Sequence, residues 1–267
     1  MASGGTAGTR TVDLADMTAE RLDAGAAMLS LAQVQGAREV VVELGAAGIP
    51  VLVLKGPPFQ ERFLGSPAAY PSLDLDLMVH EPDAERALTV LQQRGWSRPD
   101  DNNAFFWKTS RAVNLQRGSV VLDLHWGVHA GALSSAVFQA VTDSLWERAT
   151  CAAAGWWEPR PEPLFVYLVV HAAGHHFAEG KWDRGITAVA EHVTDWDEVD
   201  ALAAAAHVTE VVRFARARIE SDSEPRPVPH GVLDGPRGTA LTAFWSLVRG
   251  RFLPRTARDR LRAHMKP

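Results

Sequence analysis

The chain has 267 residues, of which 46% are hydrophobic and 22% charged, and its 27 basic and 32 acidic side chains give a formal net charge of -5. Such a chain can bury a core of its own, and its mild acidity makes a nucleic-acid partner held by charge alone unlikely. The single cysteine, Cys151, excludes an internal disulfide, and no run reaches the roughly 20 apolar residues of a membrane helix. We therefore expect a cytoplasmic protein that makes no membrane contact.

The first third of the chain predicts a tail, helices and one buried strand. Residues 1–16 hold few large apolar side chains and are expected to form a flexible N-terminal tail. Apolar residues then recur at helical spacing over 17–44, which predicts one or two helices. The run PVLVLKG at 50–56 is apolar and ends in glycine, which is typical of a buried strand, and the prolines that follow predict a brief helix over 57–64.

The segment LDLDLMV at 73–79 alternates between carboxylate and apolar side chains. Side chains alternate sides along a strand, so Asp74 and Asp76 are predicted to share one face. An amphipathic helix is expected next, over 82–95, and then a hairpin formed by the strands at 105–115 and 120–126. The α+β core, a short mixed sheet with flanking helices, is expected to span residues 17–130.

Beyond residue 130 alanine-rich helical patterns predominate, which predicts an α-helical domain over 131–267. Pro-containing stretches at 157–163 and 224–236 are expected to be exposed connections within it. Its last segment, 249–266, is rich in arginine, which is typical of a solvated basic helix; a surface facing phosphate or another anion is the alternative.

Paired acids on one strand face carry the chemistry that the sequence predicts. Neighbouring carboxylates repel each other, so Asp74 and Asp76 require a compensating cation, and oxygen ligands favour Mg²⁺, with Mn²⁺ as an alternative. Asp123 lies between leucines on a later strand and is expected to complete the metal site. Taken alone, the paired acids fit equally well on the solvated face of an edge strand.

A glycine turn upstream favours the metal site. Lys55 and Gly56 end the apolar strand just before a predicted helix, where backbone N–H groups bind phosphate readily. The order of glycine turn, Asp-x-Asp strand and later Asp strand resembles the nucleotidyltransferase superfamily with a polymerase-β-type core. More narrowly, VLKG at 53–56, SLDLDLMV at 72–79 and LDLHW at 122–126 resemble an uncharacterised bacterial family of nucleotidyltransferases, the fifth of the named NTP-transferase families.

This resemblance covers about residues 28 to 200 and implies a reaction class. It implies that Asp74, Asp76 and Asp123 bind Mg²⁺, that Asp123 is the general base, and that Lys55 and Gly56 hold the phosphates. A nucleoside monophosphate would pass from an NTP, such as ATP, to a hydroxyl of a small molecule or peptide. The carboxylates do not record which phosphorus is attacked, so a phosphotransferase using the same metal site is an alternative.

Two departures from the family pattern support another alternative. Pro57 follows Gly56 where the superfamily usually has Gly or Ser, and Tyr70 to Ser72 stand where relatives commonly carry an arginine. Both changes remove groups that could bind phosphate. A catalytically silent relative that binds nucleotide or has a regulatory role would also fit them.

Other side chains are candidates for the substrate cleft. His171 and His175 are four apart on a predicted helix and share a face, but the glutamate of a zinc-protease motif is missing, which disfavours zinc. His125 is two residues from Asp123 and is expected either to orient the metal ligands or to contact the acceptor; a packed histidine is the alternative. Trp182 and Arg184 follow the histidine pair and are expected to line the cleft.

Overall fold

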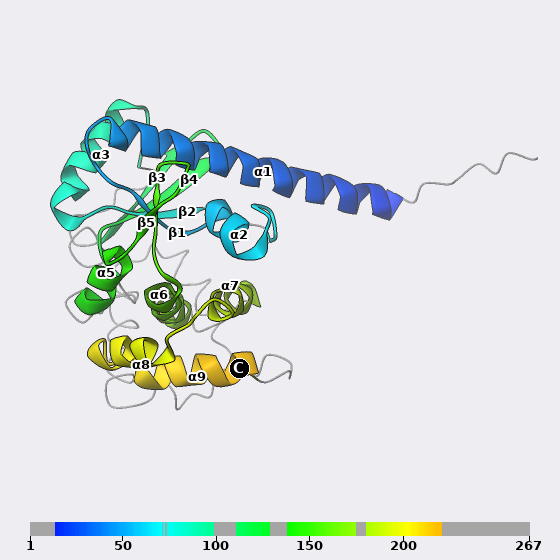
Figure 1. Cartoon of the computed structure of the whole chain (residues 1–267). Coiled ribbons are helices and arrows are strands. Elements are labelled where there is room, and N and C mark those ends of the chain that lie inside the picture. The colour runs from blue at the N-terminus through cyan, green and yellow to red at the C-terminus, as the bar shows by residue number, and fades with distance from the viewer. Residues whose placement is uncertain are drawn as a thin grey trace, which may run out of the picture.

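The structure is a computed structural model that describes residues 14–70, 72, 74–98, 111–128, 138–174 and 180–220. In this part of the chain a mixed sheet lies between helices (Figure 1). Helices α1 and α3 lie above the sheet in that view, α5, α6 and α7 lie below it, and α8 and α9 form a further layer. The helices span α1 (Leu14–Gly45), α2 (Pro57–Leu64), the 3-10 helix η1 (Glu81–Asp83), α3 (Ala84–Gln93), α5 (Gln139–Trp146), α6 (Pro161–Gly174), α7 (Gly180–Ala190), α8 (Trp196–Ala205) and α9 (Thr209–Glu220).

Six strands of the described residues form one sheet in the order β3-β4-β2-β1-β6-β5. The central pair β1 and β2 is antiparallel, whereas β4 runs parallel to β2 and β6 runs parallel to β1. The outer pairs, β3 with β4 and β5 with β6, are antiparallel. The strands span β1 (Leu52–Lys55), β2 (Leu75–Met78), β3 (Ala112–Arg117), β4 (Val120–His125), β5 (Thr150–Cys151) and β6 (Trp157–Glu158).

The register of the three central strands aligns polar residues in an otherwise apolar sheet. Lys55 on β1 pairs with Asp76 on β2, and Asp76 pairs with Asp123 on β4. The leucines at 75, 77, 122 and 124 are fully buried and point to the opposite face of the sheet from these residues. One face of the sheet is therefore apolar here, and the other presents a row of charged groups.

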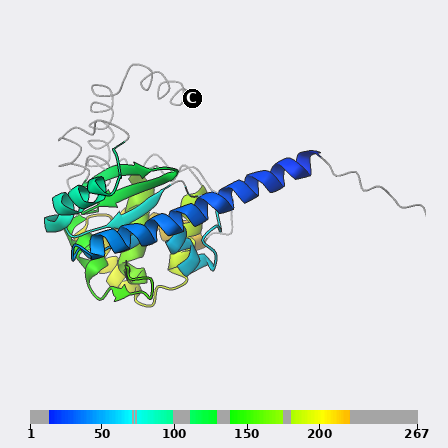
Figure 2. The ribbon, with the colours of Figure 1, turned by 90° about the horizontal axis from the view of Figure 1, so that it is seen from above.

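Helix α1 covers the sheet and also extends past it. Its second half packs against α2, α3 and β4, and Ala37, Val40 and Leu44 are fully buried there. Its first turns project beyond the rest of the fold in both views (Figures 1 and 2), and Met28 and Leu31 remain 72% and 61% exposed. No helix among the described residues is both long enough and apolar enough to cross a bilayer.

Helix α6 is the centre of the helical part. It packs against α5, α7, α8 and α9, and all its residues from Leu164 to Val170 are buried. A helix that is apolar all round needs neighbours on every side, which explains why four helices surround this one. Its C-terminal half brings side chains to the charged row of the sheet.

Several predicted elements have different bounds in the structure. Helix α1 begins at Leu14, inside the segment 1–16 expected to be a tail. The expectation of an all-helical chain beyond residue 130 is wrong at residues 150–158, because β5 and β6 lie there and extend the sheet. The stretch 157–163 is not an exposed connection, since it contains β6 and the first residues of α6, with Glu162 buried.

Candidate active site

The charged row across β1, β2 and β4 is the candidate active site. Its central residue, Asp76, is 1% exposed, although it carries a carboxylate. The Nζ atom of Lys55 lies 3.0 Å from Asp76 Oδ1, and Nε2 of His125 lies 3.1 Å from the same oxygen. A buried carboxylate needs such partners, because desolvation of an isolated charge costs on the order of several kcal/mol.

Helix α6 contributes to this row through His171. Lys55 Nζ lies 3.0 Å from His171 Nε2 as well as 3.0 Å from Asp76 Oδ1. An ammonium group can only donate, so Nε2 of His171 accepts and its proton is on Nδ1. Lys55 therefore links the sheet to the helical part of the fold. His171, which the sequence predicted to line the cleft, contacts this lysine.

A divalent cation fits the acids of this row. The second oxygen of Asp76, Oδ2, is buried and has no hydrogen-bond partner among the described residues. Asp76, Asp123 and His125 each offer a ligand atom, and these atoms lie within 4.8 Å of one another. An unpartnered buried carboxylate oxygen beside a second carboxylate is the donor set that Mg²⁺ or Mn²⁺ prefers.

The two facing acids have opposite pKa shifts. Burial by itself raises the pKa of Asp76, but the charge of Lys55 and the hydrogen bond from His125 outweigh it and hold that pKa well below its usual range. Burial raises the pKa of Asp123 to about 7, and the charges of Asp76 and Asp74 add to this effect. Asp76 is therefore ionised at neutral pH, whereas Asp123 exchanges a proton in the physiological range.

Asp123 also has a neighbour on the outer side of the row. Asn114 faces it in the register of β3 and β4, and its Nδ2 donates to Asp123 Oδ1. This amide fixes one carboxylate oxygen and leaves the other for a ligand or a proton. The sequence analysis did not single out Asn114, because its role depends on the hairpin register.

Asp74 lies just before β2 rather than within it. Its backbone oxygen accepts from Ser72 Oγ at 3.1 Å, and the backbone oxygen of Ser72 accepts from the buried Gln33 at 3.1 Å, so α1 holds this segment. The charge of Asp74 adds to the rise in the pKa of Asp123. Asp74 is not in the group of three described side chains with ligand atoms within 4.8 Å, so its metal contact stays a prediction.

Gly56 packs directly against the acidic segment. Its φ is +94°, and a Cβ atom built there would lie 3.0 Å from the backbone oxygen of Asp74 and 3.3 Å from Cα of Leu75. Only glycine combines this φ with such a close approach. Gly56 is also the N-cap of α2, so the predicted phosphate-binding turn and the predicted metal ligands are adjacent.

Of the remaining predicted cleft residues, Trp182 and Arg184 lie on α7. Arg184 is exposed on α7, and its charge partly offsets the burial and the charges of Asp76 and Asp74, which together raise the pKa of Tyr70 to about 12. Arg184 is thus on the site's side of α7. His175 and the side chain of Trp182 lie outside the described residues.

The sequence analysis did not single out two tyrosines, Tyr70 and Tyr167, whose pKa values are raised by burial and further by the charges of the acids. Tyr70 was considered only as a replacement for arginine. Tyr167 is one helical turn before His171 on α6, and this i, i+4 spacing was the signal that could have identified it.

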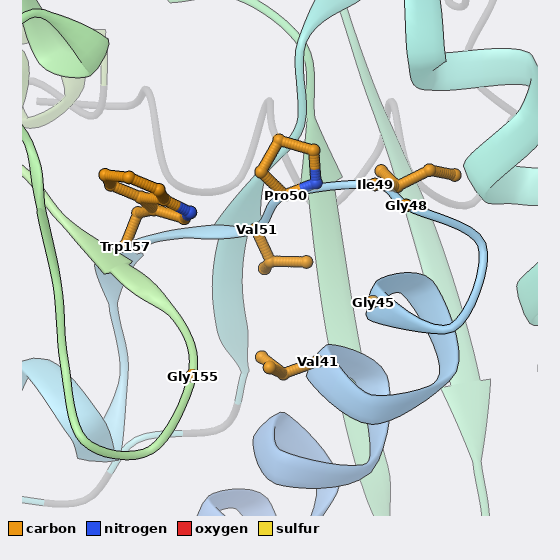
Figure 3. Close-up of a pocket in the computed structure, with 8 residues that line it drawn as sticks. All are labelled: Val41, Gly45, Gly48, Ile49, Pro50, Val51, Gly155 and Trp157. Carbon is orange, nitrogen blue, oxygen red and sulfur yellow. The ribbon is translucent and has the colours of Figure 1, made fainter.

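A pocket elsewhere in the fold carries none of this chemistry. It has a volume of about 290 Å³ and is formed where α1 ends, where β1 begins and by the β5–β6 turn (Figure 3). Val51 and Trp157 line it, and it contains no charged side chain. The pocket lies at the start of β1, whereas Lys55 is at the other end of that strand. We therefore do not assign the candidate active site to this pocket.

The chain is similar to one family model and to solved structures. A family model described as uncharacterised nucleotidyltransferase matches residues 15–221. No curated protein matches the chain significantly. The chain is similar to the solution structure of the antibiotic-resistance factor ANT(2'')-Ia, with 14% sequence identity, coverage of 70% of this chain and 96% of that chain, and a TM-score of 0.48. It is also similar to the crystal structure of ANT(2'')-Ia in complex with adenylyl-2''-tobramycin, with 14% identity, coverage of 66% and 97%, and a TM-score of 0.45.

Proposed function

Since the chain belongs to the family of uncharacterised nucleotidyltransferases, we propose that it moves a nucleoside monophosphate from an NTP to a hydroxyl of a small molecule or peptide. Membership in this family makes the chain a transferase. The proposal rests above all on one observation: Asp76 and Asp123 face each other in register, beside Lys55, and Asp76 keeps a buried oxygen that has no hydrogen-bond partner in the described part of the chain.

The chain's residues fit a divalent cation. We propose that Asp76 Oδ2 and Asp123 hold Mg²⁺, with Asp74 as a third ligand and Mn²⁺ as a substitute ion. Bound there, the cation would neutralise charge on the triphosphate and on the departing pyrophosphate. His125 would act through Asp76, because it contacts Oδ1 and leaves Oδ2 as the oxygen that could hold the cation.

The reaction then follows from the positions of the acids and the lysine. Asp123 accepts the proton of the acceptor hydroxyl as the general base. The acceptor oxygen forms a bond to the α-phosphorus while the bond from that phosphorus to the bridging oxygen breaks, and pyrophosphate leaves. Lys55 supplies positive charge at the phosphates, and the bend at Gly56 lets the backbone approach them.

This function is tested by measuring pyrophosphate release from each of the four NTPs, with Mg²⁺ and a panel of hydroxyl acceptors. Asp76→Asn and Asp123→Asn are expected to abolish release, whereas Asp143→Asn on α5, an exposed acid outside the row, serves as the matched control. Mass spectrometry of the acceptor identifies the reaction, because a nucleotidyl adduct is far heavier than a phosphate. A phosphate adduct would replace the proposal with a phosphotransferase, and nucleotide binding without turnover would replace it with a silent relative.

A further inference from the structure

Tyr167 on α6 is a buried residue whose hydroxyl the proposed reaction leaves unused. It is 2% exposed, and its hydroxyl group has no hydrogen-bond partner among the described residues. A buried polar group without a partner destabilises the folded protein. Phenylalanine would fill the same volume without this cost, so the hydroxyl calls for an explanation.

The position of Tyr167 supplies one. Its ring centroid lies 5.8 Å from that of His171, and His171 contacts Lys55, which contacts Asp76. The phenol is therefore on the face of α6 that meets the charged row. Burial raises the pKa of Tyr167 well above its ordinary value, and the charges of Asp76 and Asp123 raise it further, so the hydroxyl keeps its proton and is a donor at neutral pH.

The charged row and the face of α6 that meets it thus hold two buried polar atoms of opposite kind. Asp76 Oδ2 is an acceptor and Tyr167 O–H is a donor, yet they are not bonded to each other. A ligand that satisfies both must offer positive charge to the carboxylate and an oxygen to the phenol. A divalent cation that carries a phosphate oxygen supplies both groups at once.

We propose that the Tyr167 hydroxyl is a substrate-binding group that donates a hydrogen bond to a phosphate oxygen of the metal-bound nucleotide. This inference rests on the proposed function and adds to it a residue from the helical part of the fold. Helix α6 would then contact the triphosphate directly. The free protein bears the cost of the unpartnered hydroxyl, and nucleotide binding relieves it.

Tyr167→Phe tests the assignment through affinity and stability together. Nucleotide affinity is measured by calorimetry with Mg²⁺ and each NTP, and thermal unfolding is measured without nucleotide. A hydrogen bond to a charged group is lost, so we expect roughly 10- to 100-fold weaker nucleotide binding. The Tm of the free variant is expected to equal or exceed that of the wild type, a result that a structural hydrogen bond would not give.

Thr142→Val is the matched control. Its buried hydroxyl donates to Phe138 O and accepts from Val128 N, so this variant is expected to lower the Tm and leave nucleotide affinity unchanged. Unchanged nucleotide affinity in Tyr167→Phe would overturn the inference while the proposed function stands. So would a loss confined to the acceptor KM or to the affinity for Mg²⁺ alone. A wild-type protein that neither binds nor turns over any NTP would overturn the proposed function and this inference with it.

Discussion

Asp76 and Asp123 face each other in register on the parallel strands β2 and β4, and the protein shifts the pKa values of their carboxyl groups in opposite directions. Lys55 and His125 both contact Asp76, whereas Asp123 has an amide neighbour, Asn114. One acid is thereby a permanent anion, and the other can take up a proton near neutral pH. This division suits a metal ligand beside a general base.

Asp76→Asn is expected to reduce transfer by about 1000-fold, because the charge stabilisation supplied by a bound metal is worth several kcal/mol. The measurement is kcat/KM for Mg²⁺-dependent pyrophosphate release. Circular dichroism checks that the variant is folded, since Lys55 loses its carboxylate partner in this change. Activity within tenfold of the wild type would rule out Asp76 as the central metal ligand.

Metal affinity is expected to increase as the pH rises through about 7, the pKa of Asp123 in the free protein. Below that pH Asp123 is protonated, and the proton must leave before the carboxylate can bind a cation. Titration calorimetry with Mg²⁺ in buffers of different ionisation enthalpy measures the released proton. Asp123→Asn should remove both the pH dependence and the proton release; a pH-independent wild type would contradict the role of Asp123.

Gly56→Ala is expected to lower the free energy of unfolding by about 1 to 3 kcal/mol, because φ at this residue is +94° and the new Cβ would meet the Asp74 carbonyl. The displaced segment carries Asp74, so activity should fall as well. Thermal unfolding and pyrophosphate release measure the two effects. Gly45→Ala is the control: a Cβ there meets nothing within 4 Å, and little change is expected.

Glu162 stabilises the helical part in a pH-dependent manner. Its buried Oε1 accepts from the backbone N–H groups of Thr194 and Asp195 and from the Thr194 hydroxyl. Burial opposes ionisation, but these bonds lower the pKa below its ordinary value, so the stabilisation is present above about pH 4.5 and is lost as the pH falls through the lowered pKa.

Glu162→Gln should therefore cost about 1 to 3 kcal/mol of unfolding free energy at pH 7, and the difference from the wild type should shrink below pH 4.5. Denaturant unfolding at both pH values measures it. Glu191→Gln, at an exposed position, provides the comparison and should be neutral. An equal loss at both pH values would show that the charge of Glu162 is not what stabilises these bonds.

The sequence predicted the elements around the acids because local patterns encode them. Alternation in 73–79 indicated that Asp76 points away from the leucine face, and glycine at position 56 indicated a bend. Sheet order and register depend on contacts between distant segments, so Lys55 could not be aligned with Asp76 and Asp123 from spacing alone. The two-residue strands β5 and β6 are too short to show a period, and they were mistaken for part of a helical region.

The helical side of the site was predicted less completely. His171 was identified because it lies four residues before His175 on a predicted helix, but Tyr167 lies in an apolar run where a tyrosine is usually a core residue. Its significance depends on the unpartnered hydroxyl, which only the packing of α6 against the row reveals.

The most direct test of the central claim is the position of a bound cation. Crystals grown with Mn²⁺ and a non-hydrolysable NTP analogue would locate the ion by anomalous scattering. Our account predicts an anomalous peak bonded to Asp76 Oδ2 and to a carboxylate oxygen of Asp123. A peak elsewhere, or nucleotide bound with no ion between these two residues, would contradict it.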